Sequence, residues 1–295
     1  MKHISWGKIL IHVFFIVFSL MFIIPILSVV SISLTDESVL ESVGYSLIPK
    51  EISTLAYTYI FANPQQIIDG YAVTIFVSAV GTVLSLLVTT SVAYALSRDT
   101  FVYRKGITYY LFFTMLFSGG LVPSYILNTQ YLGLGNSIWV YIIPSILNAW
   151  NIVVVRTFMQ GIPSALVESA KIDGASEYCI YWRIILPLSK PVIATIGLLT
   201  LLGKWNMWQE SMLYIRNTRL YTLQYLLQRM LLDAQFAQQM SNIMPGAVSM
   251  TEAVEVPSES MRFAMCVLAA GPMLVVFPFF QKYFSKGLTV GAVKG

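Results

Sequence analysis

A short charged segment, residues 162–187, lies between long uncharged runs and carries side chains spaced for contact with a partner. Glu168, Lys171 and Ile172 follow one another at i, i+3 and i+4, which places them on one face of a helix. That face offers an acid, a base and an aliphatic side chain together. The spacing predicts a docking element exposed to water, and we assign no catalytic residue to it.

The flanking residues predict how this segment folds. Pro163 suits the first helical position, where its missing N–H is not needed. Gly174 can adopt the left-handed conformation that ends a helix, and a second helix should stop before Pro187. We therefore expect a short helix, a sharp turn and a second short helix.

A second group of residues combines aromatic rings with amides and one carboxylate. Rings match the C–H faces of sugars, whereas amides and carboxylates bind hydroxyl groups. The candidate residues of this substrate path are Asn148, Trp150, Asn151, Trp205, Asn206, Trp208, Gln209 and Glu210. Two alternative roles stay open for them, because aromatic residues also form an interfacial belt and asparagines also join helices within a membrane.

The composition predicts a membrane protein. Hydrophobic residues make up 57% of the 295 residues and charged residues 11%, and the mean hydropathy is +0.72, outside the range of soluble domains. No residue is charged within 9–35, 70–97 or 263–281, and each run is near the length of about 20 residues that crosses a bilayer. The uncharged run 106–155 is too long for one crossing, and its polar stretch 128–136 divides it into two.

A sixth, weaker span, the fifth in chain order, is expected to contain Lys204 and Glu210 in its outer half. The predicted fold class is thus all-α, a polytopic membrane protein with six transmembrane helices in one domain, 1–295. The expected helices lie near 9–33, 71–97, 107–127, 137–158, 190–212 and 262–284.

The distribution of charge predicts the orientation of these helices. With both termini in the cytoplasm, twelve Lys and Arg residues lie inside, whereas six lie outside together with ten of the fourteen acids. This is the positive-inside pattern, so the net charge of +4 reflects topology, and we expect no nucleic-acid partner. The first apolar run is longer than a signal-peptide core and lacks a small-x-small cleavage site, so it should remain as an anchor.

Several chemistries have no support in the sequence. A phosphate-binding loop would need Ser or Thr after Gly-Lys, but Gly7-Lys8 and Gly203-Lys204 are followed by Ile and Trp. No acid lies at mid-membrane depth, as a proton-coupled carrier would need. Cys179 and Cys266 are not expected to form a disulfide, and no metal-ligand spacing occurs. We therefore expect no metal and no cofactor held by this chain.

The order Glu-Ser-Ala, with Gly six residues after the Glu and then Ile-x-Leu-Pro, resembles the EAA-loop signature of inner-membrane subunits of ATP-binding-cassette importers. Ser169 stands where the family consensus has Ala. The resemblance implies the type I importer permease fold and a coupling loop, 162–187, that enters a groove of a cytoplasmic ATPase. The residues carried over to this role are Glu168, Ser169, Ala170, Asp173, Gly174, Ala175, Leu186 and Pro187.

Further motifs are similar to the carbohydrate-uptake importers that carry oligosaccharides and glycan fragments. They comprise the runs 113–123, 156–158 and 186–191, Trp205-Asn206-x-Trp208, and the Gly-rich tail 286–295. The tail resembles that of the six-helix, maltose-type inner subunit, which reaches the ATPase dimer, whereas flexible coil is the plain alternative. Lys204, Arg216 and Arg219 could favour an acidic oligosaccharide, but surface charge explains them as well.

The resemblance implies a permease subunit of an ATP-driven oligosaccharide importer in the bacterial cytoplasmic membrane. Its implied partners are a second homologous permease, two copies of an ATPase that binds the ATP, an extracytoplasmic substrate-binding protein, the oligosaccharide and the lipid bilayer. The implied mechanism is alternating access. The alternatives are a secondary carrier and a polytopic membrane enzyme acting on lipid-linked sugar.

The segment 213–261 is expected to be the largest extracytoplasmic loop. Leu223, Leu226, Leu227 and Met230 recur at helical spacing, which predicts an amphipathic helix. That helix either lies on the membrane surface or forms a platform for the binding protein, and the sequence leaves both open.

Overall fold

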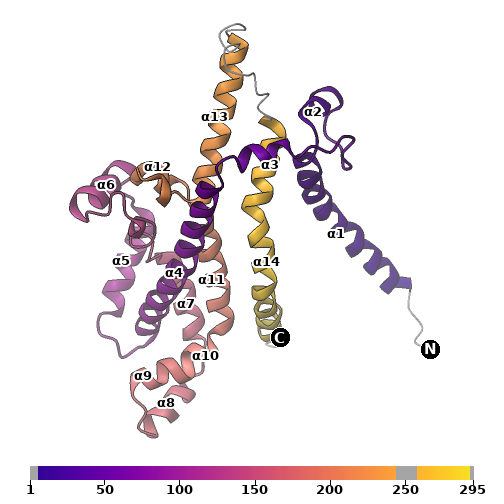
Figure 1. The fold of residues 1–295 in the computed structure, drawn as a ribbon. Coiled ribbons are helices and arrows are strands. Elements are labelled where there is room, and N and C mark those ends of the chain that lie inside the picture. Colours follow the sequence, from indigo (N-terminus) through magenta and orange to yellow (C-terminus); the bar gives the residue numbers. More distant parts are fainter. Residues whose placement is uncertain (1–5, 244–257, 293–295) are drawn as a thin grey trace. The chain divides into compact units, whose positions relative to one another are not determined.

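The computed structural model describes residues 6–243 and 258–292, and all the regular secondary structure in these two ranges is helical (Figure 1). An isolated antiparallel bridge joins Thr35 to Ile52. The described residues thus have the expected all-α class. The chain divides into two compact units, Met1–Ile67 with Leu226–Pro272, and Ile68–Tyr225 with Met273–Gly295.

The first unit contains a long apolar helix, two short helices that follow it, and parts of three further helices. Its described elements are α1 (Trp6–Ser33), α2 (Glu37–Val43), α3 (Leu55–Ile60), the first turn of α4 (Pro64–Ser97), most of α13 (Leu223–Ile243) and the first part of α14 (Ser258–Ala292). The apolar stretch of α1 has a mean hydropathy of 2.9, and its most apolar window is not buried in the chain at all. The surface of α1 is therefore suited to lipid or to a protein neighbour.

Glu37 caps the start of α14 within this unit. Its carboxylate accepts hydrogen bonds from the backbone N–H groups of Glu259 and Ser260, at 2.9 and 3.0 Å, and from the Ser260 hydroxyl at 2.9 Å. A carboxylate at a helix N-terminus satisfies free N–H groups and opposes the helix dipole. Asp36 caps α2 in turn, and the hydrogen bond from the Ser38 hydroxyl lowers the pKa of Asp36.

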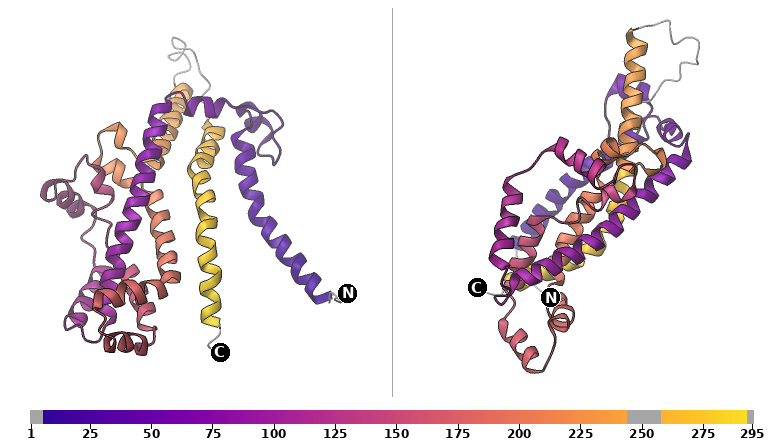
Figure 2. Two further views of the ribbon diagram at one scale, coloured as in Figure 1. Left: turned by 60° about the horizontal axis from the view of Figure 1, so that its bottom comes forward. Right: turned by 90° about the vertical axis from the view of Figure 1, so that its left-hand side faces the viewer.

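The second unit contains most of α4 and a series of shorter helices (Figure 2). They are α5 (Arg104–Leu116), α6 (Leu121–Ile126), η1 (Leu127–Tyr131), η2 (Ile138–Tyr141), α7 (Ala149–Gln160), α8 (Ser164–Ile172), α9 (Glu177–Ile180), η3 (Tyr181–Ile185), α10 (Leu186–Leu188), α11 (Lys190–Trp205), α12 (Gln209–Tyr214) and η4 (Thr218–Leu220). One apolar cluster joins α4, α7, α8, α9, η3 and α11, and a second joins α4 to η2 and residues 215–221.

A seam of small polar residues runs along the buried side of α4. Its members are three to four residues apart and almost fully buried: Thr74, Ser78, Thr82, Ser85 and Thr89. The Ser85 hydroxyl donates to the Ile146 carbonyl at 2.9 Å, and Thr74 Oγ1 accepts from the Leu223 N–H at 2.9 Å. Small hydroxyl side chains allow close approach of backbones and supply hydrogen bonds between elements in a membrane.

Three of the expected helices correspond to helices of the structure that are long and apolar enough to cross a membrane. The expected helices 9–33, 71–97 and 262–284 fall within α1, α4 and α14, whose apolar stretches are Ile9–Ser33, Pro64–Ser97 and Glu259–Pro278. Two bent pairs also pass this test in the described ranges, α5 with α6–η1 at 116° and α9–α10 with α11 at 77°. If each bent pair is one span, the described residues hold up to five.

The remaining expected helices are interrupted. The expected helix 107–127 breaks at residues 117–120, where Gly120 has φ +88°. The expected helix 137–158 is not continuous, because η2 and α7 are separated by residues 142–148, which contain Pro144. Pro144 has no N–H to donate, and the Asn148 side chain accepts from the Asn151 N–H and so starts α7 anew. The expected helix 190–212 is divided between α11 and α12.

Candidate functional site

The segment that we expect to dock a partner folds as two short helices around one turn. α8 begins at Ser164, one residue later than expected, so Pro163 is its N-cap and not its first helical residue. Gly174 has φ +78°, so the predicted left-handed turn is confirmed. The Ser176 side chain then accepts from the Cys179 N–H and caps α9. The turn is therefore fixed by glycine on one side and by a serine cap on the other.

The expectation that the second helix stops before Pro187 is wrong. The helix continues through the π-turn η3 into α10, which contains Pro187. In this wider turn the Leu186 N–H bonds to the Tyr181 carbonyl, five residues earlier. A proline ring clashes with the carbonyl four residues before it in an α-helix. A π-turn just before the proline relieves that restriction, so the chain stays helical up to the bend before α11.

One side of this loop is packed into the second unit. Val167, Ala170, Ile180, Tyr181 and Ile185 are buried in the cluster that they share with α4, α7 and α11. This packing means that the loop and the three helices move together unless a buried apolar contact is broken.

Polar contacts add to the attachment. The Tyr94 hydroxyl of α4 donates to Glu177, and Lys171 pairs with the other oxygen of Glu177 at 2.7 Å. The hydroxyls of Thr90 and Tyr181 share a hydrogen bond of 2.8 Å. The hydrogen bond from Lys171, and then that from Tyr94, lowers the pKa of Glu177. Glu177 therefore links α8, α9 and α4 through one carboxylate.

The other side of the loop is exposed. Among the predicted coupling residues, Glu168, Ser169, Asp173, Gly174 and Pro187 are exposed, Ala175 and Leu186 are half-buried, and Ala170 is buried. Large apolar side chains lie on the exposed side as well, with Ile172 at 86% exposed and Tyr178 at 80%. Glu168, Lys171 and Ile172 all lie on α8 and are all exposed, as the spacing requires.

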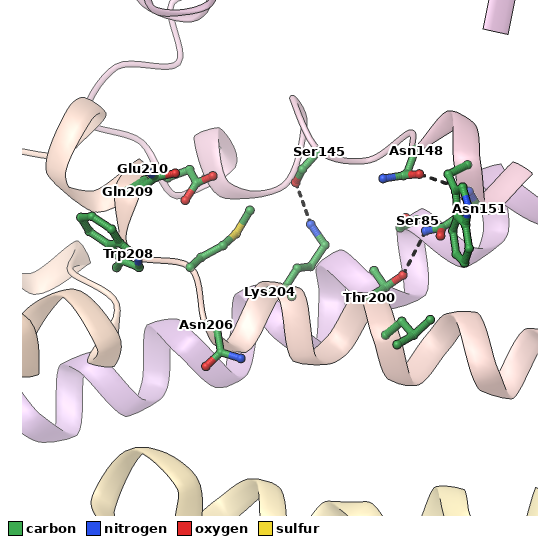
Figure 3. Close-up of a pocket in the computed structure, with 14 residues that line it drawn as sticks. Ser85, Ser145, Asn148, Asn151, Thr200, Lys204, Asn206, Trp208, Gln209 and Glu210 are labelled. Carbon is green, nitrogen blue, oxygen red and sulfur yellow. Dashed lines mark hydrogen bonds between the residues drawn. The ribbon is translucent and has the colours of Figure 1, made fainter. Parts of the chain in front are cut away.

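A polar cavity of about 430 Å³ lies in the second unit (Figure 3). All but one of the predicted substrate-path residues line it: Asn148, Trp150, Asn151, Asn206, Trp208, Gln209 and Glu210. These residues come from the ends of three helices, because Asn148 starts α7, Asn206 ends α11 and Trp208 starts α12. Breaks between the helices thus bring polar groups to one place.

The amides of the cavity have structural partners. Asn148 caps α7, and the Asn151 side-chain amide donates to Thr200 of α11 at 3.5 Å. The Asn206 amide donates to the Leu202 carbonyl, and its oxygen accepts from Gln224 at 3.2 Å. These asparagines therefore do join structural elements, as the alternative interpretation of the sequence states. They line the cavity as well.

Trp205 is the exception among the predicted residues. It is 3% exposed and does not line the cavity. The cavity lining also holds residues that we did not assign to the site from the sequence: Ser85, Ser145, Leu199, Thr200, Gly203, Lys204 and Met207. The sequence signal for Lys204 was its position as a charge within an apolar helix, which marks a functional position in a membrane protein.

The loop and the cavity lie at different ends of the second unit. In Figures 1 and 2, α8 and α9 occupy one end, and α6 and α12 lie toward the other. α11 connects them, because it begins next to α10 and ends at the cavity residues Lys204 and Asn206. This arrangement defines a helical membrane component with an exposed two-helix loop, residues 162–187, toward one end and a polar cavity toward the other. Because we expect this loop to dock a partner, we call it the docking loop.

Comparisons with known proteins agree with that class. Residues 1–290 match the family of binding-protein-dependent transport system inner membrane components, and the chain belongs to this family. It is 37% identical, over 97% of both chains, to the polygalacturonan/rhamnogalacturonan transport system permease protein YtcP of Bacillus subtilis (strain 168). It is 29% identical to the arabinooligosaccharides transport system permease protein AraQ of the same organism, over 98% of this chain and 96% of AraQ.

A solved structure matches as well. It is a chain of a bacterial ABC transporter involved in the import of the acidic polysaccharide alginate, with a TM-score of 0.76 and 28% identity, over 96% of this chain and all of that chain. The chain is thus a membrane-embedded transport component of the importer class, and the comparisons give no support to the membrane-enzyme alternative.

Parts of two predictions fall outside the described residues. The expected extracytoplasmic loop 213–261 contains the end of α12, η4 and α13, but residues 244–257 are not described. α13 does begin at Leu223, and Leu223, Leu226 and Leu227 are buried as their helical spacing predicts. Residues 293–295 of the Gly-rich tail, with Lys294, are likewise outside the described residues.

Proposed function

We propose that this chain is the permease subunit of an ATP-driven importer that moves oligosaccharides across the cytoplasmic membrane. The observation that carries the proposal is the cavity of the second unit, which gathers amides, indole rings and a carboxylate at the breaks between helices. Rings and amides together suit the alternating C–H faces and hydroxyls of a sugar chain. The permeases YtcP and AraQ, which have polysaccharide and oligosaccharide transport in their names, support the same substrate class.

The docking loop is the proposed contact with the ATPase. Its exposed side presents Glu168 together with apolar side chains such as Ile172 and Tyr178, a combination suited to insertion into a groove. Its buried side belongs to the cluster with α4, α7 and α11. A displacement of the loop by the ATPase therefore reaches the helices that carry the cavity lining.

The remaining partners follow from the family and from the charge pattern. We place the loop in the cytoplasm with both termini, because that orientation satisfies the positive-inside rule. A second homologous permease would complete the pathway, two ATPase copies would bind the ATP, and an extracytoplasmic binding protein would deliver the sugar. Transport then alternates between an outward and an inward state of the cavity, and ATP favours one of them by differential contacts at the loop.

The direct test is ATP hydrolysis by the complete assembly. The chain is co-expressed with its second permease, ATPase and binding protein, and the complex is placed in lipid nanodiscs. ATPase activity is then measured with a panel of neutral and acidic oligosaccharides. Stimulation by a sugar that requires the binding protein is the expected result. A folded complex that responds to no sugar would contradict the proposal and favour the secondary carrier.

A further inference from the structure

A lysine lies buried at the edge of the sugar cavity. Lys204, near the end of α11, is 3% exposed and lines the cavity. Its ammonium donates to the Ser145 hydroxyl at 2.9 Å and to the Tyr141 carbonyl at 3.4 Å. Both acceptors are neutral, so these contacts satisfy hydrogen bonds without balancing the charge.

The side chain is held in this position by close packing. Gly81 of α4 lies against its stem, where an added Cβ would be 2.7 and 2.8 Å from Lys204 Cδ and Cε. A larger residue at position 81 would require the lysine side chain to shift. Figure 3 shows the side chain directed toward Ser145, on the side of the cavity where Asn148 also lies. The ammonium therefore lies among the residues of the cavity lining and not in the surrounding water.

The charge of Lys204 has no carboxylate partner among the described residues, because no acid lies within 4.0 Å of its nitrogen in residues 6–243 and 258–292. Glu210 is the other charged side chain of the cavity lining, and it lies on α12, apart from the ammonium in Figure 3. Glu210 attracts this charge without forming an ion pair with it. A buried ammonium that forms no ion pair is costly, and in a membrane protein it marks the pathway of a substrate or an ion.

We propose that the cavity accepts an acidic oligosaccharide and that Lys204 binds one carboxylate of it; this inference rests on the proposed function. An ammonium has three N–H donors, two of which are used by Ser145 and Tyr141. The third donor is available for one carboxylate oxygen. A single hydrogen bond needs little exposed surface, so the low exposure of Lys204 is compatible with this contact. The side-chain N–H groups of Asn148 and the ring of Trp208 then meet hydroxyls and ring faces of neighbouring sugar units.

This assignment divides the cavity into a charge-selective part and a general sugar-binding part. The structurally similar transporter is involved in the import of an acidic polysaccharide, alginate, and this agrees with a charge-selective part of the cavity. Arg216 and Arg219, the other cations considered from the sequence, are exposed and do not line the cavity. Selectivity for an acid within the membrane is therefore assigned to Lys204.

The test compares acidic sugars with their uncharged methyl esters, which have the same sugar backbone. Oligomers of galacturonate, guluronate and mannuronate are each compared with their neutral methyl esters, in nanodiscs that hold the complete importer. The variants are Lys204→Gln and Lys204→Met, which remove the charge, Lys204→Arg, which keeps it, and Lys50→Gln as an exposed control outside the cavity. Affinities of the binding protein are measured separately, and rates of wild type and variant are compared with the same loaded binding protein.

The expected result is a loss of charge selectivity. Stimulation by the acidic sugar falls roughly 10- to 100-fold in Lys204→Gln and Lys204→Met, as expected for loss of a hydrogen bond to a charged group, and stimulation by a neutral sugar persists. Lys204→Arg and Lys50→Gln retain the acidic response. An equal loss for acidic and neutral sugars, or an unchanged acidic response, overturns the inference.

Two further outcomes separate this inference from the proposed function. If only neutral sugars stimulate the wild-type complex, the inference fails and the function as an oligosaccharide permease stands. If no sugar of either kind stimulates it, the proposed function itself fails, and the role of Lys204 fails with it.

Discussion

The docking loop and the cavity are built in opposite ways, although α11 connects them. The loop owes its position to buried apolar side chains such as Val167 and Ile180, and its turn to Gly174. The cavity owes its polar lining to helix ends, where Asn148 and Asn206 lie. The loop is therefore suited to move as one body, whereas the cavity, shared among several helix ends, is suited to change shape. Substitutions should separate these two properties.

The largest effect is expected at the turn of the loop. Gly174→Val places a β-branched residue at φ +78°, and no heavy atom lies within 4 Å of its Cβ position, so the cost is backbone strain and not crowding. We expect α8 and α9 to shift and sugar-stimulated ATPase activity to fall by more than about tenfold, since a misplaced contact disrupts coupling. Gly174→Asn is the matched control, because Asn tolerates this conformation. Normal stimulation in Gly174→Val would refute the role of the turn.

Two tryptophans, one in each region, allow the docking loop and the cavity to be tested separately. Trp208 lines the cavity, whereas Trp182 is exposed on the loop. Trp208→Ala should raise the sugar concentration needed for half-maximal stimulation about tenfold, with assembly unchanged, because a stacking surface is lost. Trp182→Ala should weaken the association of the ATPase by about 2 kcal/mol, typical of an interface tryptophan, with the sugar response of assembled complexes retained. Titration of sugar and of ATPase measures both, and exchanged phenotypes would contradict the comparison.

A smaller effect is expected where the loop is attached to α4. Tyr94→Phe removes the hydroxyl that donates to Glu177 and leaves the ring in place. Loss of one hydrogen bond costs about 1 kcal/mol, so we expect a slight fall in stability and more ATP hydrolysed per sugar transported. Tyr109→Phe, at a ring that is 74% exposed on α5, is the control. An unchanged ratio of ATP to sugar would show that apolar packing alone attaches the loop.

The smallest effect is expected at the Lys171–Glu177 pair, whose side chains are 43% and 52% exposed. Lys171→Gln should lower the free energy of unfolding by at most about 1 kcal/mol. The pKa of Glu177 is lowered in the fold, so the pair contributes fully above the ordinary pKa of a glutamate, about 4.3, and loses its contribution as pH falls through the lowered value. The difference in Tm between variant and wild type should thus be constant from about pH 6 to 8 and shrink in acid. A difference that grows in acid would contradict this sign.

Much of the fold could be predicted from uncharged runs of sequence. α1, α4 and α14 were located because composition alone determines where a straight apolar helix can cross a membrane. The interrupted helices were not, because Pro144 and Gly120 act through local backbone geometry that hydropathy does not measure. Pro187 shows the converse, since the π-turn before it keeps the chain helical where a proline predicts an end.

The candidate site was predictable to a similar degree. Residue types with sugar-binding chemistry marked half of the cavity lining, and glycine marked the turn of the loop. The sequence prediction assigned Trp205 to the substrate path and left Lys204 out of it. The two residues are adjacent on α11 and both buried, and only the packed structure shows that Lys204 lines the cavity and Trp205 does not. The contact of Lys204 with Gly81, which lies far earlier in the chain, is likewise a product of folding.

The buried and the exposed face of the docking loop tolerate different amino-acid substitutions. Substitutions at Val167 or Ala170 have to suit the chain's own helices, whereas those at the exposed Glu168, Ile172 or Tyr178 have to suit only the proposed ATPase contact. An importer that exchanges one ATPase for another can therefore adapt through a few outward positions without refolding. Hybrid importers made by grafting only these outward side chains should inherit the donor's ATPase and keep the recipient's sugar.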